Sequence, residues 1–242
     1  ENPQASKPVT GIEVWLKTPV NGSGESLSAV EKGTSIMHSI KKNFRQDNAS
    51  YVTINIPPYD DTYTHFKQCT FKSEQAQAGG SLFVDGRNAA HVGIFDRCIF
   101  DGNNLAQRGY YRSGGGGSSG SQNLINCVFK NLTLVAMNFG DCRYVKATGN
   151  IIHDCAAGID FNADSGWQNF VTNNIFHNIS GNAVTFNRDQ NFMSCQYEYN
   201  IFSDIGGHAF TAAADYMEHQ KLSMFDRNTF YNVTGSTHKN LT

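Results

Sequence analysis

Residues 174–186 read Asn-Ile-Phe-His-Asn-Ile-Ser-Gly-Asn-Ala-Val-Thr-Phe, and imperfect copies of this stretch recur through most of the chain. The copies begin at Cys69–Phe71, Cys98–Phe100, Cys127–Phe129, Asn150–Ile152, Asn174–Phe176, Asn200–Phe202 and Asn228–Phe230. Their starting positions are 29, 29, 23, 24, 26 and 28 residues apart. A near-constant period with variable insertions is typical of a solenoid, in which each turn keeps its strands but varies its loops.

Each repeat divides into three predicted strands. The first ends at the Asn or Cys position, and the second carries the aromatic or aliphatic residue two positions later. The third is a short apolar run, as in 81–85, 135–139, 158–161, 183–186 and 209–212. Equivalent residues of successive turns are expected to stack about 4.8 Å apart. The sequence therefore predicts columns of like residues along the molecule.

These columns have a structural explanation. Inward-facing Asn amides can hydrogen-bond to the turns above and below, which satisfies backbone groups that are otherwise buried unpaired. Cys69, Cys98 and Cys127 occupy the same column in the early turns. We therefore expect the six cysteines to be free, buried thiols rather than disulfides.

The chain ends are expected to differ from the repeats. Residues 1–50 are predicted to contain a strand near 11–16 and an amphipathic helix with Ile36, Met37, Ile40 and Phe44 on one face. Such a helix would cap the open end of the coils, which are predicted over 51–242 as one continuous domain and begin with a half-buried strand at 51–59. The sequence stops partway through a coil, so further chain or a partner is expected to cover that end, unless the chain is a fragment.

Composition excludes several classes of function. The formal net charge is -2, which gives no basis for binding nucleic acid. No apolar run approaches the roughly 18 residues that a membrane-spanning helix needs, so no membrane insertion is expected. Charged residues make up only 17% of the chain and glycines number 23, which favours short strands and tight turns over helices.

The repeat resembles the right-handed parallel β-helix of the pectate-lyase-like (pectin lyase-like) superfamily. The Asn column is similar to the asparagine ladder of that family, and the predicted helix before Tyr51 resembles its N-terminal cap. The resemblance covers residues 34–242 and implies an all-β, single-stranded right-handed parallel β-helix with an N-terminal helical cap. It is specific for the fold, whereas many unrelated chemistries share this fold.

The resemblance also implies where a substrate lies, because the groove of that family runs along one parallel sheet and the loops after it, here the third strands. Alternation along these strands predicts an outward, polar face. Its members are Asn138, Asp160, Asn162, Thr185, Asn187 and Thr211. The nearby residues are expected to be Arg112, Asp164, Arg188, Asp189, His208 and Tyr216.

Three chemistries could use a polar face of this kind. A polysaccharide lyase acting on uronic acids would use Asp160 with Arg188 or Arg112 as base or carboxylate clamp. Ca²⁺ would then be held by Asp160, Asp164 and Asp189. A glycosidase would need two carboxylates, for which Asp160 and Asp189 are the available pair. An esterase would need paired aspartates with a Gln-rich oxyanion site, which the sequence lacks.

Simpler explanations stand beside these. Aspartates commonly cap turns, and this alone accounts for Asp164 and Asp189. His153 and His177 follow the Phe column and are expected to be exposed, with no Cys/His set at zinc spacing. The leading hypothesis is a secreted, periplasmic or cell-surface protein that acts on or binds an acidic polysaccharide, as a lyase or a relative of one. The alternative is a non-catalytic carbohydrate-binding or structural β-helix of the surface or phage-tail type.

Overall fold

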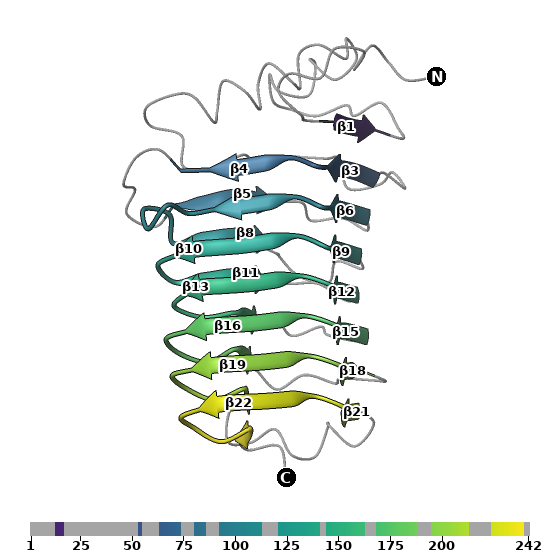
Figure 1. Cartoon of the computed structure of the whole chain (residues 1–242). Helices are drawn as coiled ribbons and strands as arrows, with labels where there is room; N and C mark the ends of the chain where they lie inside the picture. Colours follow the sequence, from purple (N-terminus) through teal and green to yellow (C-terminus); the bar gives the residue numbers. More distant parts are fainter. Residues whose placement is uncertain are drawn as a thin grey trace.

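The computed structural model describes residues 13–16, 53–54, 63–73, 80–85, 92–112, 121–140, 144–162, 168–187, 195–212 and 224–239. These residues form an all-β parallel solenoid without a helix, as predicted from the repeat (Figure 1). The predicted N-terminal helix lies outside the described residues. No helix in the described part of the chain has the length and apolar character needed to cross a membrane.

Three sheets make up the solenoid, and each turn contributes one strand to each sheet in the order predicted from the repeat. The first sheet contains β1 (Glu13–Leu16), β3 (Tyr63–Lys67), β6 (Val92–Asp96), β9 (Ser121–Ile125), β12 (Tyr144–Thr148), β15 (Gln168–Thr172), β18 (Gln196–Glu198) and β21 (Met224–Asp226). The second sheet contains β4 (Thr70–Lys72), β7 (Ile99–Asp101), β10 (Val128–Leu132), β13 (Ile151–Cys155), β16 (Ile175–Ile179), β19 (Ile201–Ile205) and β22 (Thr229–Val233). The third sheet contains β2 (Thr53–Ile54), β5 (Ser81–Asp85), β8 (Arg108–Arg112), β11 (Val135–Phe139), β14 (Ile159–Phe161), β17 (Val184–Phe186), β20 (Phe210–Ala212) and β23 (His238–Lys239).

The N-terminal strand departs from the repeat. β1 runs antiparallel to β3, whereas the other pairings between described strands are parallel. In backbone register, Glu13 lies opposite Lys67 and Leu16 lies opposite Thr64. β1 therefore supplies backbone partners to the edge of the first sheet, which a solenoid otherwise leaves unpaired at its end. Within the predicted half-buried strand at 51–59, the described part is β2.

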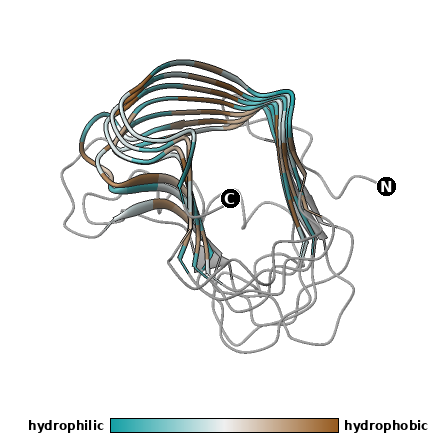
Figure 2. Ribbon diagram, turned by 90° about the horizontal axis from the view of Figure 1, so that it is seen from below, coloured by the Kyte–Doolittle hydropathy of each residue, from teal (hydrophilic) through white to brown (hydrophobic). Residues whose placement is uncertain are grey.

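The core lies between the three sheets, which surround it when the solenoid is seen along its axis (Figure 2). Stacked phenylalanines form its most regular part. The ring centroids of Phe100 and Phe129 lie 4.4 Å apart with the rings nearly parallel, and those of Phe176 and Phe202 lie 4.9 Å apart. Register pairing places equivalent apolar side chains one above the other, with Ile152 between Phe129 and Phe176, so the repeat of the sequence becomes a continuous apolar column.

An asparagine ladder (Asn150, Asn174, Asn200 and Asn228) links the turns at the corner between the first and second sheets. Oδ1 of Asn174 accepts hydrogen bonds from the backbone N–H and the side-chain amide of Asn150, at 2.9 and 3.0 Å. Nδ2 of Asn174 donates to the carbonyl oxygen of Ala147 at 2.9 Å. Asn200 makes the equivalent bonds to Asn228 and Val171. The amides thus satisfy buried backbone groups at each turn, as predicted.

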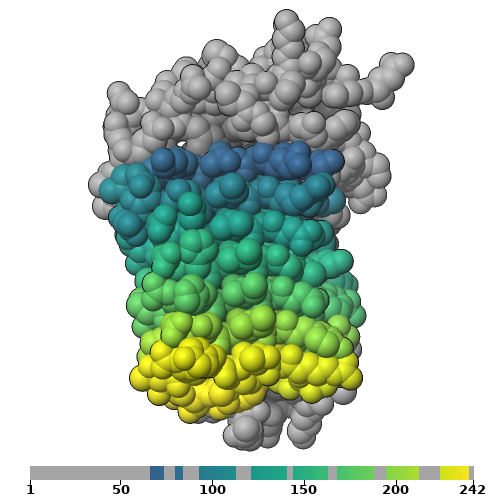
Figure 3. All heavy atoms as spheres, in the orientation of Figure 1, coloured from purple at the N-terminus to yellow at the C-terminus, as the bar shows by residue number. Residues whose placement is uncertain are grey.

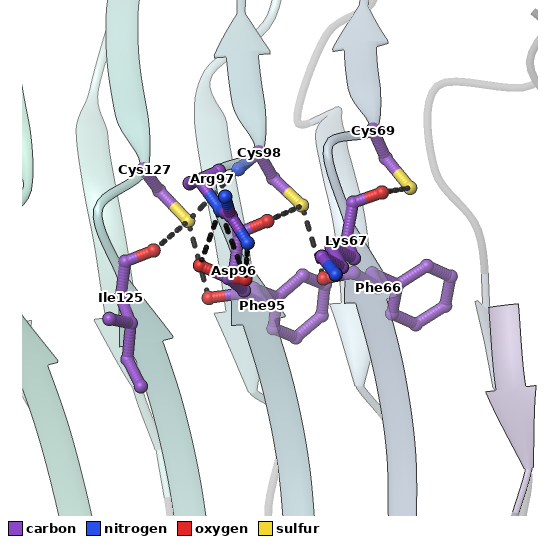
Figure 4. A network of polar contacts seen from close by, with 9 residues as sticks. All are labelled: Phe66, Lys67, Cys69, Phe95, Asp96, Arg97, Cys98, Ile125 and Cys127. Atoms are coloured by element: carbon purple, nitrogen blue, oxygen red, sulfur yellow. Dashed lines mark hydrogen bonds and ion pairs between the residues drawn. The ribbon is translucent and has the colours of Figure 1, made fainter. Parts of the chain in front are cut away.

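A thiol column (Cys69, Cys98 and Cys127) continues this ladder toward the N-terminus (Figure 4). Sγ of Cys98 donates to the carbonyl oxygen of Phe66 at 3.4 Å, and Sγ of Cys127 donates to that of Phe95 at 3.4 Å. Sγ of Cys127 also accepts from the backbone N–H of Cys98. The thiols therefore take the donor and acceptor roles of the amides. The five cysteines within the described residues are buried and take part in no disulfide, as expected.

The outer face of the second sheet carries a row of partly exposed aliphatic residues. They are Ile99, Val128, Ile151, Ile175 and Ile201, which are register partners on successive strands. The successive turns appear on this side as parallel bands in Figure 3. A second outward row follows two residues later and contains Lys130, His153, His177 and Ser203.

Candidate functional site

A polar column follows the outer face of the third sheet and is called the Asp160 column here. Its members are the register partners Tyr111, Asn138, Asp160, Thr185, Thr211 and Lys239. Each comes from a different strand, β8 through β23, so the column runs along much of the solenoid. The sequence predicted four of these six residues: Asn138, Asp160, Thr185 and Thr211.

Strand alternation places Asp160 outward, as predicted. Its neighbours Ile159 and Phe161 are buried in the core, and Phe161 stacks on Phe139 and Phe186. Val184 is buried in the same way on β17, where Thr185 faces outward. The apolar residues thus determine which side chains of each strand face the core, and the polar residue between them faces outward.

Asp160 has the electrostatics of a proton-transfer group. Burial raises the pKa of its carboxyl group from 3.8 to about 6, while a hydrogen bond with Thr185 and the charge of Arg108 oppose this rise. Desolvation disfavours the charged form of a carboxyl group, so a shift in this direction is expected where neighbours cover the side chain. A carboxyl group with a pKa close to neutral can both accept and donate a proton under ordinary conditions.

Asn138 precedes Asp160 in the column and is almost fully covered, with 6% of its surface exposed. No described group donates a hydrogen bond to its Oδ1 atom. A buried polar atom without a partner is costly, and native structures keep such atoms mainly where a ligand, a water molecule or a functional constraint is involved. Oδ1 of Asn138 is therefore an acceptor available to a water molecule or a ligand at this position.

Arg108 and Tyr111 complete one end of the column, and neither was predicted from the sequence as a site residue. The guanidinium carbon of Arg108 lies 5.0 Å from the centroid of the Tyr111 ring, which is the geometry of a cation–π contact. Arg108 also contributes a favourable charge to Asp160. Aligning 108–112 with 135–139 would have found Tyr111, because Tyr110 then falls in the core column of Met137 and Tyr111 in the column of Asn138.

Arg112 was expected at the groove, and this expectation is wrong. Its side chain is 0% exposed and its register partner is Phe139, whose ring lies in the core. Tyr110, two residues earlier, also points inward and donates a hydrogen bond from its hydroxyl group to Oε1 of Gln122 at 2.9 Å. The strand β8 therefore holds Arg112 inside and Tyr111 outside.

The remaining described residues of the predicted groove lie at three different places on the third sheet and its corners. Asn187 donates from Nδ2 to Oδ1 of Asn162 at 2.6 Å, so these two amides pair just beyond β14 and β17. Thr211 is 9% exposed and lies in the Asp160 column beside Thr185. His208 lies at a corner before β20, where its Nδ1 accepts a hydrogen bond from the backbone N–H of Ser236 at 2.7 Å. His208 thereby links successive turns.

Four predicted site residues lie outside the described residues: Asp164, Arg188, Asp189 and Tyr216. The proposed Ca²⁺ ligands Asp164 and Asp189 are among them, so the structure supplies no geometry for that ion. Within the described part of the chain, no group of three or more His, Cys, Asp or Glu residues is arranged to hold a metal ion.

Comparison with protein-family models, curated proteins and solved structures found no match. The site is therefore interpreted from its own chemistry. The Asp160 column offers a carboxyl group that titrates near pH 6, a nearby guanidinium group, an amide oxygen without a described partner and an aromatic ring. This combination suits an elongated polar ligand with negative charge, since Arg binds carboxylates and aromatic rings stack on the apolar faces of sugars.

Proposed function

We propose that this protein is a β-helix of the pectate-lyase-like superfamily that binds and cleaves an acidic polysaccharide along the Asp160 column. The observation that carries the proposal is the position of Asp160, whose partly buried carboxyl group lies in a polar column between Asn138 and Thr185. The reaction favoured by this environment is β-elimination at a uronic acid unit. Such a substrate implies a secreted, periplasmic or cell-surface location.

In this reaction Asp160, as the carboxylate, takes the proton from C5 of the sugar. The electron pair left on C5 forms the C4=C5 double bond, and the bond between C4 and the glycosidic oxygen breaks. That oxygen then takes up a proton from water or from an acid. The uronate carboxylate must be neutralised for C5 to lose its proton, and Arg108 supplies a positive charge close to Asp160.

Arg188 and Ca²⁺ held by Asp164 and Asp189 remain part of the proposal as additional means of neutralising the substrate. A bound Ca²⁺ ion would bind uronate oxygens through its hard, oxygen-preferring coordination. Asn162, Asn187, Thr211, His208 and Tyr216 are proposed to contact the sugar chain on either side of the cleaved bond. Arg112 is no longer included, because its side chain is buried in the core.

The test is a lyase assay with pectate, alginate and chondroitin, each with Ca²⁺ and with a chelator, that follows ultraviolet absorbance of the unsaturated product. We expect one polymer to give product and Asp160→Asn to lower the rate by about 10²–10⁴-fold. Arg108→Gln should weaken binding of the acidic polymer. Asp96→Asn is the matched control, because Asp96 lies on the first sheet and pairs with Arg97. An Asp160→Asn variant with the parental rate would contradict the role of Asp160.

A non-catalytic glycan-binding or structural module is the second candidate. The observation favouring it is that Asp160 is the one carboxylate among the described members of its column, so a described second carboxylate for glycoside hydrolysis is lacking. Retained binding of an acidic polymer without product from any member of the panel would favour this module. Binding that Arg108→Gln weakens would then still assign the ligand to the same face.

A further inference from the structure

Two histidines on the outer face of the second sheet lie side by side, far from the Asp160 column in the fold. His153 of β13 and His177 of β16 are register partners on adjacent parallel strands. Equivalent positions of such strands are about 4.8 Å apart, and both side chains leave the same face of the sheet. The two imidazole rings can therefore reach one common point in front of the sheet.

A carboxylate lies close to Nδ1 of each ring. Nδ1 of His153 lies 2.7 Å from Oδ2 of Asp154, and Nδ1 of His177 lies 3.3 Å from Oδ2 of Asp204. A carboxylate can only accept a hydrogen bond, so Nδ1 of His153 carries the proton, whereas His177 meets Asp204 at ion-pair distance. In neutral His153, Nε2 is then the atom with the free lone pair, and no described residue bonds to Nε2 of either histidine.

The carboxylates are themselves held by amides of the next turn. Asn178 donates from Nδ2 to Oδ1 of Asp154 at 2.6 Å, and Asn232 donates to Oδ1 of Asp204 at 2.7 Å. These hydrogen bonds orient both carboxylates. Each histidine thus has an oriented carboxylate beside it, which is the arrangement that supports metal-binding histidines in proteins.

The residues on either side of His153 and His177 in the row, Lys130 and Ser203, have partners of their own. Lys130 precedes His153 in the row, and its ammonium nitrogen lies 3.4 Å from Oδ2 of Asp101 on the preceding strand. Ser203 follows His177, and its hydroxyl group donates to Asp204 at 2.9 Å. The side chains of His153 and His177 are 28% and 52% exposed, so solvent and ions reach them.

We propose that His153 and His177 form a binding site for a divalent late transition-metal ion such as Zn²⁺ or Cu²⁺. The two Nε2 atoms are the protein ligands, and water fills the other coordination positions. Imidazole nitrogen selects these ions over Mg²⁺ and Ca²⁺, which prefer oxygen. Zinc–nitrogen bonds of about 2.0–2.1 Å are compatible with two rings that converge from adjacent strands. Asp154 and Asp204 act as positioning residues.

The experiment is isothermal titration calorimetry of the full chain, without a histidine tag, with ZnCl₂ and CuCl₂. We expect one site whose affinity falls at least tenfold in His153→Gln and in His177→Gln. Asp154→Asn keeps the size of the side chain but removes the carboxylate, and it should weaken binding by about 10–100-fold. His65→Gln is the control, because His65 belongs to β3 of the first sheet, and it should leave the affinity unchanged.

Electron paramagnetic resonance of the Cu²⁺ complex provides an independent readout. We expect hyperfine coupling to two imidazole nitrogens in the parent and to one in either histidine variant. Absence of binding at millimolar metal, affinity that either histidine variant retains, or coupling to a single nitrogen in the parent would each overturn the proposal. Circular dichroism of each variant verifies that the solenoid is intact, so a lost signal reports on the site.

Discussion

The backbone N–H of Cys127 donates a hydrogen bond of 2.9 Å to Oδ1 of Asn150, and at this contact the thiol column meets the asparagine ladder. On one side of the contact, amide oxygens accept backbone hydrogen bonds at about 2.9–3.0 Å. On the other side, Sγ of Cys127 accepts from Cys98 at 3.4 Å. Sulfur is a weak acceptor, so the ladder is weaker in the thiol column.

Replacing Cys127 by Asn should therefore stabilise the protein. The new Oδ1 atom would accept from the N–H of Cys98, and the new amide could donate to the carbonyl oxygen of Phe95, which Sγ now contacts. We expect the free energy of unfolding in urea to rise by about 1 kcal/mol, the net value of a typical hydrogen bond. Cys127→Ala is the comparison and should destabilise. Equal destabilisation by both substitutions would show that the column depends on the volume of sulfur.

Removing an amide from the ladder should have a much larger effect. Asn174→Ala loses the acceptor for two bonds from Asn150 and the donor to Ala147, all of them buried. Each buried group left without a partner costs about 1–3 kcal/mol, so we expect a loss of about 3–5 kcal/mol in urea unfolding. Asn123→Ala, on the outer face of the first sheet, should cost less than about 1 kcal/mol. Similar losses at both positions would contradict the structural role of the ladder.

The two faces of a single strand provide a further comparison. Phe176 is buried in the aromatic column, whereas its neighbour Ile175 is 37% exposed. Phe176→Ala should lower the free energy of unfolding by about 3–5 kcal/mol, because it leaves a cavity between stacked rings. Ile175→Ala should cost less than about 1 kcal/mol. Thermal or urea unfolding of the two variants measures the difference, and a reversed order would mean that β16 has the opposite phase.

The sequence was sufficient to predict these columns because the same residue types recur at equivalent positions of successive repeats. Asn174, Asn200 and Asn228 occupy one position in successive copies, so their stacking followed from the period alone. The outward position of Asp160 followed in the same way, since Ile159 and Phe161 on either side are apolar. Each of these predictions depended on a local pattern that neighbouring turns reproduce.

The prediction failed where a turn departs from the repeat. β8 reads Arg-Gly-Tyr-Tyr-Arg, which lacks a simple alternation of apolar and polar residues, so the burial of Arg112 could not be recognised from the sequence. Arg108 was missed for the same reason. The pKa of Asp160 was also beyond the sequence, because it depends on the burial produced by the surrounding turns.

The carboxyl group of Asp160 should make stability depend on pH in a recognisable way. Its pKa is raised by burial from 3.8 to about 6, so the folded state binds this proton more tightly than the unfolded state. The resulting stabilisation is fully present below pH 3.8 and is lost as the pH rises through about 6.

Asp160→Asn remains neutral at every pH, and its amide can still pair with Thr185. We therefore expect Asp160→Asn to be more stable than the parent at pH 7–8 by about 1–3 kcal/mol and to lose this advantage near pH 4. Urea unfolding of both proteins between pH 4 and 8 measures the difference, in which the titration of the other carboxyl groups cancels. A difference that does not change with pH would show that Asp160 keeps an ordinary pKa, and would remove the main support for its role in proton transfer.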